Sequence, residues 1–90
     1  MTQTIRIVLV EDHEMVSAGF SAVMNAEDDL EVLAIGENVE RGIDLIGSIQ
    51  PDVVVTDFNL PDGTGGEVAA AAQTLDPAPT VLMILSLIHI

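Results

Sequence analysis

Residues 51–68 read PDVVVTDFNLPDGTGGEV, and this stretch decides the fold. Its three consecutive valines, residues 53–55, form a short β-branched run that is typical of a strand buried on both faces. The run ends at Asp57, and the proline and glycines that follow predict a loop at 61–66. The stretch therefore predicts a buried strand with a carboxylate at its carboxyl end.

On both sides of this stretch, short apolar runs typical of strands alternate with segments whose apolar residues recur with the spacing of a helix. Strands are expected at residues 5–10, 30–35, 53–57 and 80–85. The helices between them are indicated by apolar residues spaced three or four apart: Val16, Phe20 and Val23; Val39, Ile43 and Ile46; Val68, Ala72 and Leu75. The alternation predicts an α/β fold, a doubly wound parallel sheet with helices on both faces. Right-handed crossovers place the first three strands in the order 2-1-3.

Length and composition narrow the class of protein. Ninety residues suffice for one small domain, and the absence of cysteine excludes disulfides and thiolate metal sites, which favours a reducing cytoplasm. The longest apolar run, 81–90, is about half of what a membrane-spanning helix needs. Fifteen acidic residues face two arginines, for a net charge of −13. We therefore expect no direct nucleic-acid binding by this chain and no membrane association.

Three carboxylates are expected to converge at one edge of the sheet. Glu11 and Asp12 follow the first strand and Asp57 follows the third, and ligands bind beyond the carboxyl ends of such strands where the strand order reverses. Like charges held close together need a cation between them, and an all-oxygen set favours Mg²⁺. The alternative is that Glu11 and Asp12 only stabilise the positive N-terminal end of the next helix.

Two segments of the chain resemble a known family. IRIVLVEDHEMVSAGF at 5–20 and the stretch at 51–68 are similar to the signature regions of response-regulator receiver domains of two-component signalling. The likeness is closest to the branch with a helix-turn-helix output domain. It covers about 5–86, so residues 1–90 are expected to form one incomplete receiver domain with a doubtful tail at 87–90. The resemblance implies a flavodoxin-like receiver fold with strand order 2-1-3-4.

The resemblance also implies a function and a set of site residues. Asp57 would be the phosphoacceptor, taking a phosphoryl group from a sensor histidine kinase. Glu11, Asp12, Asp57 and the backbone carbonyl of Asn59 would hold Mg²⁺, and Ser86 would be the switch hydroxyl. The chain would be a cytoplasmic phosphoprotein rather than an enzyme. The intact protein would regulate transcription, contacting DNA only through an output domain that these residues do not contain.

The chain departs from the family pattern at its C-terminal side. The family's catalytic lysine has no counterpart, because the sequence contains no lysine, and the fifth strand and last helices are lacking. We therefore expect a truncated domain in which strand 80–85 is an exposed edge. Such an apolar, uncharged edge favours self-association, which light scattering would detect.

Several alternatives stay open at this point. Ser86 could be an ordinary strand-end hydroxyl, and His13 is expected to be a solvated residue at a helix start rather than a metal ligand. The chain could be a pseudo-receiver that binds a partner without being phosphorylated. A haloacid-dehalogenase-like phosphatase is disfavoured, because its second aspartate would fall at Asn59, which cannot act as a general acid or base.

Overall fold

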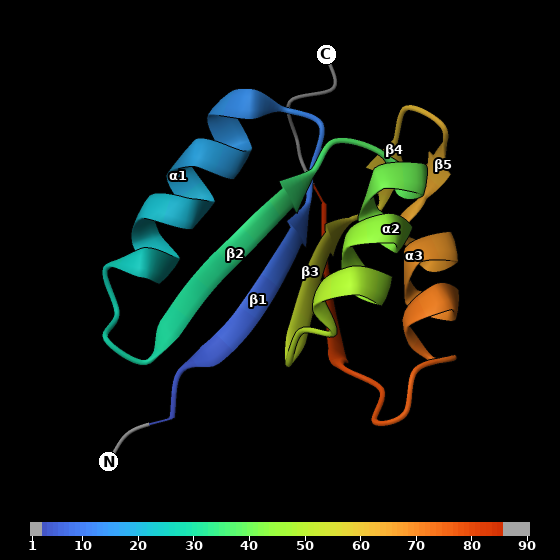
Figure 1. Ribbon diagram of the computed structural model, residues 1–90. Coiled ribbons are helices and arrows are strands. Elements are labelled where there is room, and N and C mark those ends of the chain that lie inside the picture. The colour runs from blue at the N-terminus through green and yellow to red at the C-terminus, as the bar shows by residue number, and fades with distance from the viewer. Residues whose placement is uncertain (1–2, 86–90) are drawn as a thin grey trace.

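The computed structural model describes residues 3–85 and contains a four-stranded parallel sheet (Figure 1). Its strands are β1 (Ile5–Val10), β2 (Leu30–Gly36), β3 (Val53–Asp57) and β6 (Thr80–Ile84). They lie in the order β2-β1-β3-β6, and all three pairings are parallel. Counted as the four strands of this sheet, the order is 2-1-3-4, so the predicted α/β class and strand order are confirmed.

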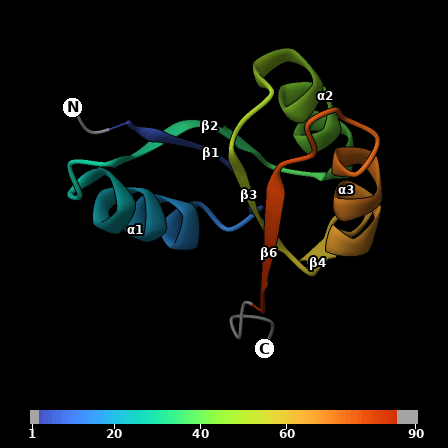
Figure 2. The same ribbon diagram turned by 90° about the horizontal axis from the view of Figure 1, so that it is seen from below.

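Helices cover both faces of the sheet. Helix α1 (Glu14–Asn25) lies on one face, and α2 (Val39–Ile49) and α3 (Gly65–Ala72) lie on the other (Figure 2). The strand side chains alternate accordingly: in β1, Ile7 and Leu9 belong to the core under α1, whereas Val8 and Val10 belong to the core under α2 and α3. All four side chains are buried, which explains why residues 7–10 of β1 are apolar on both faces.

The loop predicted after β3 is more ordered than the sequence indicated. Residues 59–64 form a small antiparallel hairpin of β4 (Asn59–Leu60) and β5 (Gly63–Thr64). Gly65 follows it directly, and a Cβ atom there would meet the carbonyl oxygen of Asp57 at 2.5 Å. Only glycine therefore allows the start of α3 to pack this closely against the end of β3.

Helix α3 is shorter than its apolar stripe predicts. It ends at Ala72, and the next residues form turn hydrogen bonds, including Leu75 N–H to the Ala72 carbonyl. Leu75 still packs against the core under α2 and α3, so its apolar character reflects tertiary packing rather than continued helix. Across the described part of the chain, no helix is both long enough and apolar enough to cross a membrane.

One of the two arginines closes the C-terminal end of α2. The Arg6 guanidinium donates to the carbonyls of Ile49, at 2.7 Å, and of Gln50, at 2.8 Å. Gln50 has the left-handed conformation, with φ of 53°, that commonly ends a helix. Because the last carbonyls of a helix lack intrahelical partners and carry partial negative charge, a cation placed there stabilises the helix.

We expect Arg6→Ala to lower the free energy of unfolding by about 1–2 kcal/mol, since it removes two charge-assisted hydrogen bonds to the end of α2. Urea denaturation followed by circular dichroism would measure the change. Arg41→Ala removes the other arginine, which is exposed, and is the matched control, with an expected change within about 0.5 kcal/mol. Equal losses in the two variants would contradict this role for Arg6.

Candidate functional site

Asp57 lies at the carboxyl end of β3 and is completely buried. In the parallel pairing, Val10 is the partner of Thr56, so the residues that follow β1 arrive beside Asp57. Glu11 is 1% exposed, while Asp12 is more accessible to solvent. The register of β1 against β3 thus brings together three acidic residues that are up to 46 positions apart in sequence.

The predicted convergence of the three carboxylates is present in the structure. One ligand atom from each of Glu11, Asp12, His13 and Asp57 can be chosen so that all four lie within 4.8 Å of one another. Carboxylates this close repel each other unless a cation or a hydrogen-bond donor separates them. The cluster therefore has the charge and the spacing of a cation site.

The environment of Glu11 tests whether a cation fits this site. Its side chain is fully buried, and its Oε1 atom has no hydrogen-bond partner among the described residues. A buried carboxylate oxygen without a partner is costly, and a hard divalent cation is the kind of partner that would offset the cost. The donor set and the orphaned oxygen together fit Mg²⁺, with carboxylate ligands and remaining positions for water.

His13 differs from its prediction as a solvated residue. Its ring is half-buried, and Nδ1 lies 2.9 Å from Glu11 Oε2 and 3.2 Å from Asp12 Oδ1. Its backbone N–H also donates to Glu11 Oε2, at 2.9 Å. The hydrogen bond to Glu11 raises the pKa of His13, and the charges of Asp12, Glu11 and Asp57 raise it further against the opposing effect of desolvation.

Sequence reasoning missed this arrangement, although a signal was present. An acidic residue two positions before a backbone N–H at a helix start is the spacing at which a carboxylate caps the chain locally. His13 is the N-cap residue of α1, and its ring atom Nδ1 contacts the same Glu11 oxygen as its backbone N–H.

Two further predicted site residues are not tested by these contacts. Asn59 begins β4 two residues after Asp57 and pairs with Thr64, so it lies close to Asp57 in the chain. The role of its carbonyl as a metal ligand stays a prediction. Ser86, the predicted switch hydroxyl, lies outside the described residues.

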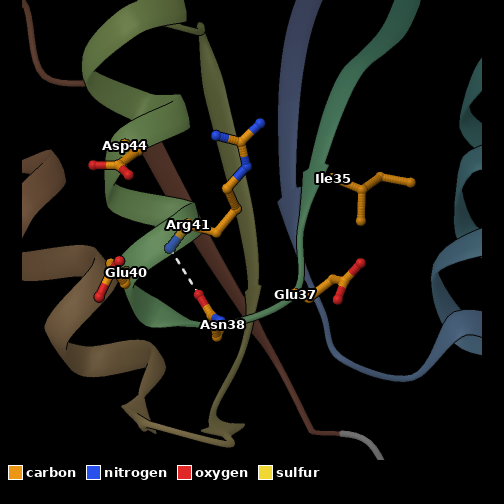
Figure 3. A pocket seen from close by; sticks show the side chains of 6 residues that line it. All are labelled: Ile35, Glu37, Asn38, Glu40, Arg41 and Asp44. Carbon is orange, nitrogen blue, oxygen red and sulfur yellow. Dashed lines mark hydrogen bonds between the residues drawn. The ribbon is translucent and has the colours of Figure 1, made fainter.

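The hairpin beside Asp57 is tied to the start of α2 by Asp62. One Asp62 oxygen accepts from Val39 N–H at 2.6 Å, and the other accepts from Glu40 N–H at 3.1 Å. The next amide, that of Arg41, donates to the Asn38 side chain at 2.7 Å (Figure 3). Side chains therefore satisfy three of the amides that the first turn of a helix leaves without intrahelical partners.

Two hollows open on this end of the molecule. One of about 370 Å³ lies beside the start of α2, lined by Ile35, Glu37, Asn38, Glu40, Arg41 and Asp44 (Figure 3). The other, of about 360 Å³, is lined by Glu11, Asp12, Glu14, Ser17, Ile35 and Glu37. Only the second reaches the acidic cluster, so we take it as the approach of solvent and ions to Glu11 and Asp12.

Asp62 gives a pH-dependent prediction. The hydrogen bond from Val39, the largest influence, lowers the pKa of Asp62 below its usual 3.8. A lowered folded-state pKa contributes stability that is complete above the unfolded value and is lost as the pH falls through the folded value. Asp62→Asn should therefore be less stable than the wild type at neutral pH, with a gap that shrinks below about pH 4.

Urea denaturation at a series of pH values would measure this gap. Asp28→Asn, in an exposed turn, is the control and should show no such pH-dependent difference. A gap for Asp62→Asn that stays constant from neutral pH to pH 3 would contradict a stabilising Asp62 carboxylate.

Comparison with known families and proteins identifies relatives that agree with one another in the family they indicate. The family model described as response regulator receiver domain matches residues 7–87. The transcriptional regulatory protein DegU of Brevibacillus brevis is 32% identical over 85 residues, which are 94% of this chain and 35% of that protein. The response regulator protein VraR of Staphylococcus aureus is 32% identical over 86 residues, which are 96% of this chain and 41% of that protein.

A solved structure agrees with these relatives in fold. The signal receiver domain of the response regulator NarL from Mycobacterium tuberculosis superposes with a TM-score of 0.84 at 27% identity. The match covers 92% of this chain and 67% of that one. The chain spans well under half the length of the two curated relatives above.

Proposed function

The chain belongs to the response regulator receiver domain family, and we propose that within it Asp57 is the residue that accepts the phosphoryl group. The observation that carries this proposal is the position of Asp57: completely buried at the end of β3, with Glu11 and Asp12 ligand atoms within 4.8 Å. Relatives of this chain carry the names of transcriptional regulators and response regulators, which supports a signalling role over a turnover enzyme.

The proposed chemistry is a single phosphoryl transfer. An Asp57 carboxylate oxygen forms a bond to phosphorus while the phosphorus–nitrogen bond of a phosphohistidine breaks, and the histidine leaves on the kinase. Three carboxylates repel the incoming phosphoryl group, so their charge must be offset. Mg²⁺ held by Glu11, Asp12, Asp57 and the Asn59 carbonyl would supply that neutralisation when bound.

The backbone around Asp57 supports this role. The side-chain hydroxyl of Thr56 donates to the Asp57 carbonyl at 3.0 Å, and Phe58 N–H donates to the Ile84 carbonyl at 2.9 Å. The first bond lies within β3, and the second joins the residue after Asp57 to β6. A carboxylate on a braced backbone favours transfer, because phosphoryl transfer depends chiefly on positioning and electrostatics.

The wider setting is also a proposal. A sensor histidine kinase is the phosphoryl donor, residues 1–90 are one receiver domain in the cytoplasm, and the whole protein regulates transcription through a DNA-binding output domain.

β6 pairs only with β3 among the described residues and exposes Leu82 and Met83 by 54% and 45%. Self-association of the 90-residue chain along β6 stays part of this proposal.

Magnesium should stabilise the fold through the acidic cluster. A ligand that binds only the folded state adds about 1.4 kcal/mol to the free energy of unfolding at ten times its Kd. Asp12→Asn should remove most of this gain, and Asp28→Asn, remote from the cluster, should retain it. Thermal unfolding with and without MgCl₂ would measure both, and an equal response in all three proteins would rule out the acidic site.

Asp57 should be the residue that carries the phosphoryl group. Incubation with acetyl phosphate and Mg²⁺ should add one hydroxylamine-sensitive phosphoryl group, seen by intact-mass spectrometry, and Asp57→Asn should add none. Labelling of the 90-residue chain should be slow and incomplete, since it contains no lysine to pair with the phosphoryl oxygens. Asp28→Asn is the control and should label like the wild type.

The labelling experiment also separates the alternatives. A chain that never labels while Asp57 is intact would be a pseudo-receiver. An adduct that survives Asp57→Asn would show that another residue is the acceptor.

A further inference from the structure

We propose that His13 is a nitrogen ligand of the acidic cluster and makes the site favour a borderline divalent cation, of which Zn²⁺ and Co²⁺ are examples, over Mg²⁺. The inference rests on the proposed function in so far as it concerns the same site. It goes beyond that function by adding a fourth side-chain ligand and by changing the class of metal that binds most tightly.

The first support is the way His13 is held. Its backbone N–H and its Nδ1 both contact Glu11 Oε2, each at 2.9 Å, and Ser17 N–H donates to its carbonyl at 2.9 Å. These contacts place the ring at the start of α1 and direct Nδ1 toward the carboxylates. A ligand whose position is already fixed loses little conformational freedom when a metal binds.

The second support is the spacing of the donor atoms. Metal–ligand distances of about 2.0–2.1 Å put neighbouring donors roughly 2.8–3.4 Å apart in octahedral or tetrahedral geometry. Nδ1 lies 2.9 Å from Glu11 Oε2 and 3.2 Å from Asp12 Oδ1, so these three atoms already have nearly the required separations. All four donor atoms lie within 4.8 Å of one another, so the set would have to contract around a bound metal.

The third support is independent of the clustering of acids. Glu11 is 1% exposed, His13 occupies one of its carboxylate oxygens, and Oε1 has no partner among the described residues. A bound cation would give this buried oxygen a partner, whereas the His13 ring alone does not reach both oxygens. The site is therefore incomplete around Glu11 without an additional positive charge.

Ligand chemistry then sets the preference. Imidazole nitrogen is a good ligand for Zn²⁺ and Co²⁺, while Mg²⁺ favours oxygen and keeps several waters. With His13 included, the cluster offers one nitrogen and three carboxylates, which is sufficient for a four-coordinate Zn²⁺. Without His13 it offers oxygen atoms alone, and the preference for Zn²⁺ and Co²⁺ over Mg²⁺ should be smaller than in the wild type.

Isothermal titration of the whole 90-residue chain with MgCl₂, CoCl₂ and ZnCl₂, separately and at one fixed pH, tests the proposal. The wild type should bind Zn²⁺ and Co²⁺ more tightly than Mg²⁺. His13→Gln should weaken Zn²⁺ and Co²⁺ binding at least tenfold and change Mg²⁺ binding less than threefold. Asp28→Asn, in an exposed turn away from the cluster, is the control and should leave all three affinities unchanged.

Co²⁺ absorption gives a second readout that does not depend on the stability of a variant. Nitrogen and oxygen coordination of low symmetry gives visible d–d bands that His13→Gln should weaken or shift, and thermal unfolding would confirm that the variant is folded. A further variant, His13→Asn, keeps a short polar side chain at the start of α1 and should show the same metal change.

The outcomes separate this proposal from the proposed function. Equal Zn²⁺-to-Mg²⁺ preference in the wild type and His13→Gln overturns the role of His13 and leaves the Mg²⁺ site of the receiver domain standing. Tight Zn²⁺ binding that depends on His13, without Mg²⁺ binding, supports the inference and contradicts the magnesium part of the function. Binding of neither metal by the wild type overturns both.

Discussion

The parallel pairing of β1 with β3 is the constraint on which the rest of this structure depends. Alternate side chains of both strands pack into the two cores on opposite faces of the sheet. A slide of one strand by one residue would turn each of its side chains to the opposite face and so disrupt both cores. The register is therefore fixed, and with it the meeting of Glu11 and Asp12 with Asp57. The hydrophobic cores thus determine where the carboxylates lie, although none of the core residues takes part in the chemistry.

The distribution of positive charge follows from the same arrangement. The sequence has two arginines, and Arg6 closes α2 at its C-terminal end while Arg41 lies in the first turn of that helix. Among the described residues, His13 is the one basic group in contact with Glu11 and Asp12. The negative charge of the buried Glu11 carboxylate is consequently balanced by the His13 imidazole and by any cation that the site binds. The net charge of the site therefore changes when a cation binds.

The sequence was sufficient for the sheet and insufficient for its loops. Apolar periodicity indicates burial, so the four strands and the three helices could be predicted. The preference for right-handed crossovers gave the order of the first three strands, and with it the convergence of the three carboxylates. The 59–64 hairpin, the end of α3 at Ala72, the anchoring of His13 and the tie from Asp62 to α2 could not. Each depends on individual hydrogen bonds of side chains or backbone groups, and such bonds leave no periodic signal in the sequence.

Gly65 has a mechanical consequence. Its N–H donates to the Phe58 carbonyl at 2.7 Å, and its missing side chain lets it touch the Asp57 carbonyl, while the same residue begins α3. The end of β3 and the start of α3 are thus in direct contact through Gly65. A displacement of the Asp57 backbone would therefore reach α3 through direct contact, without passing along the hairpin at 59–64.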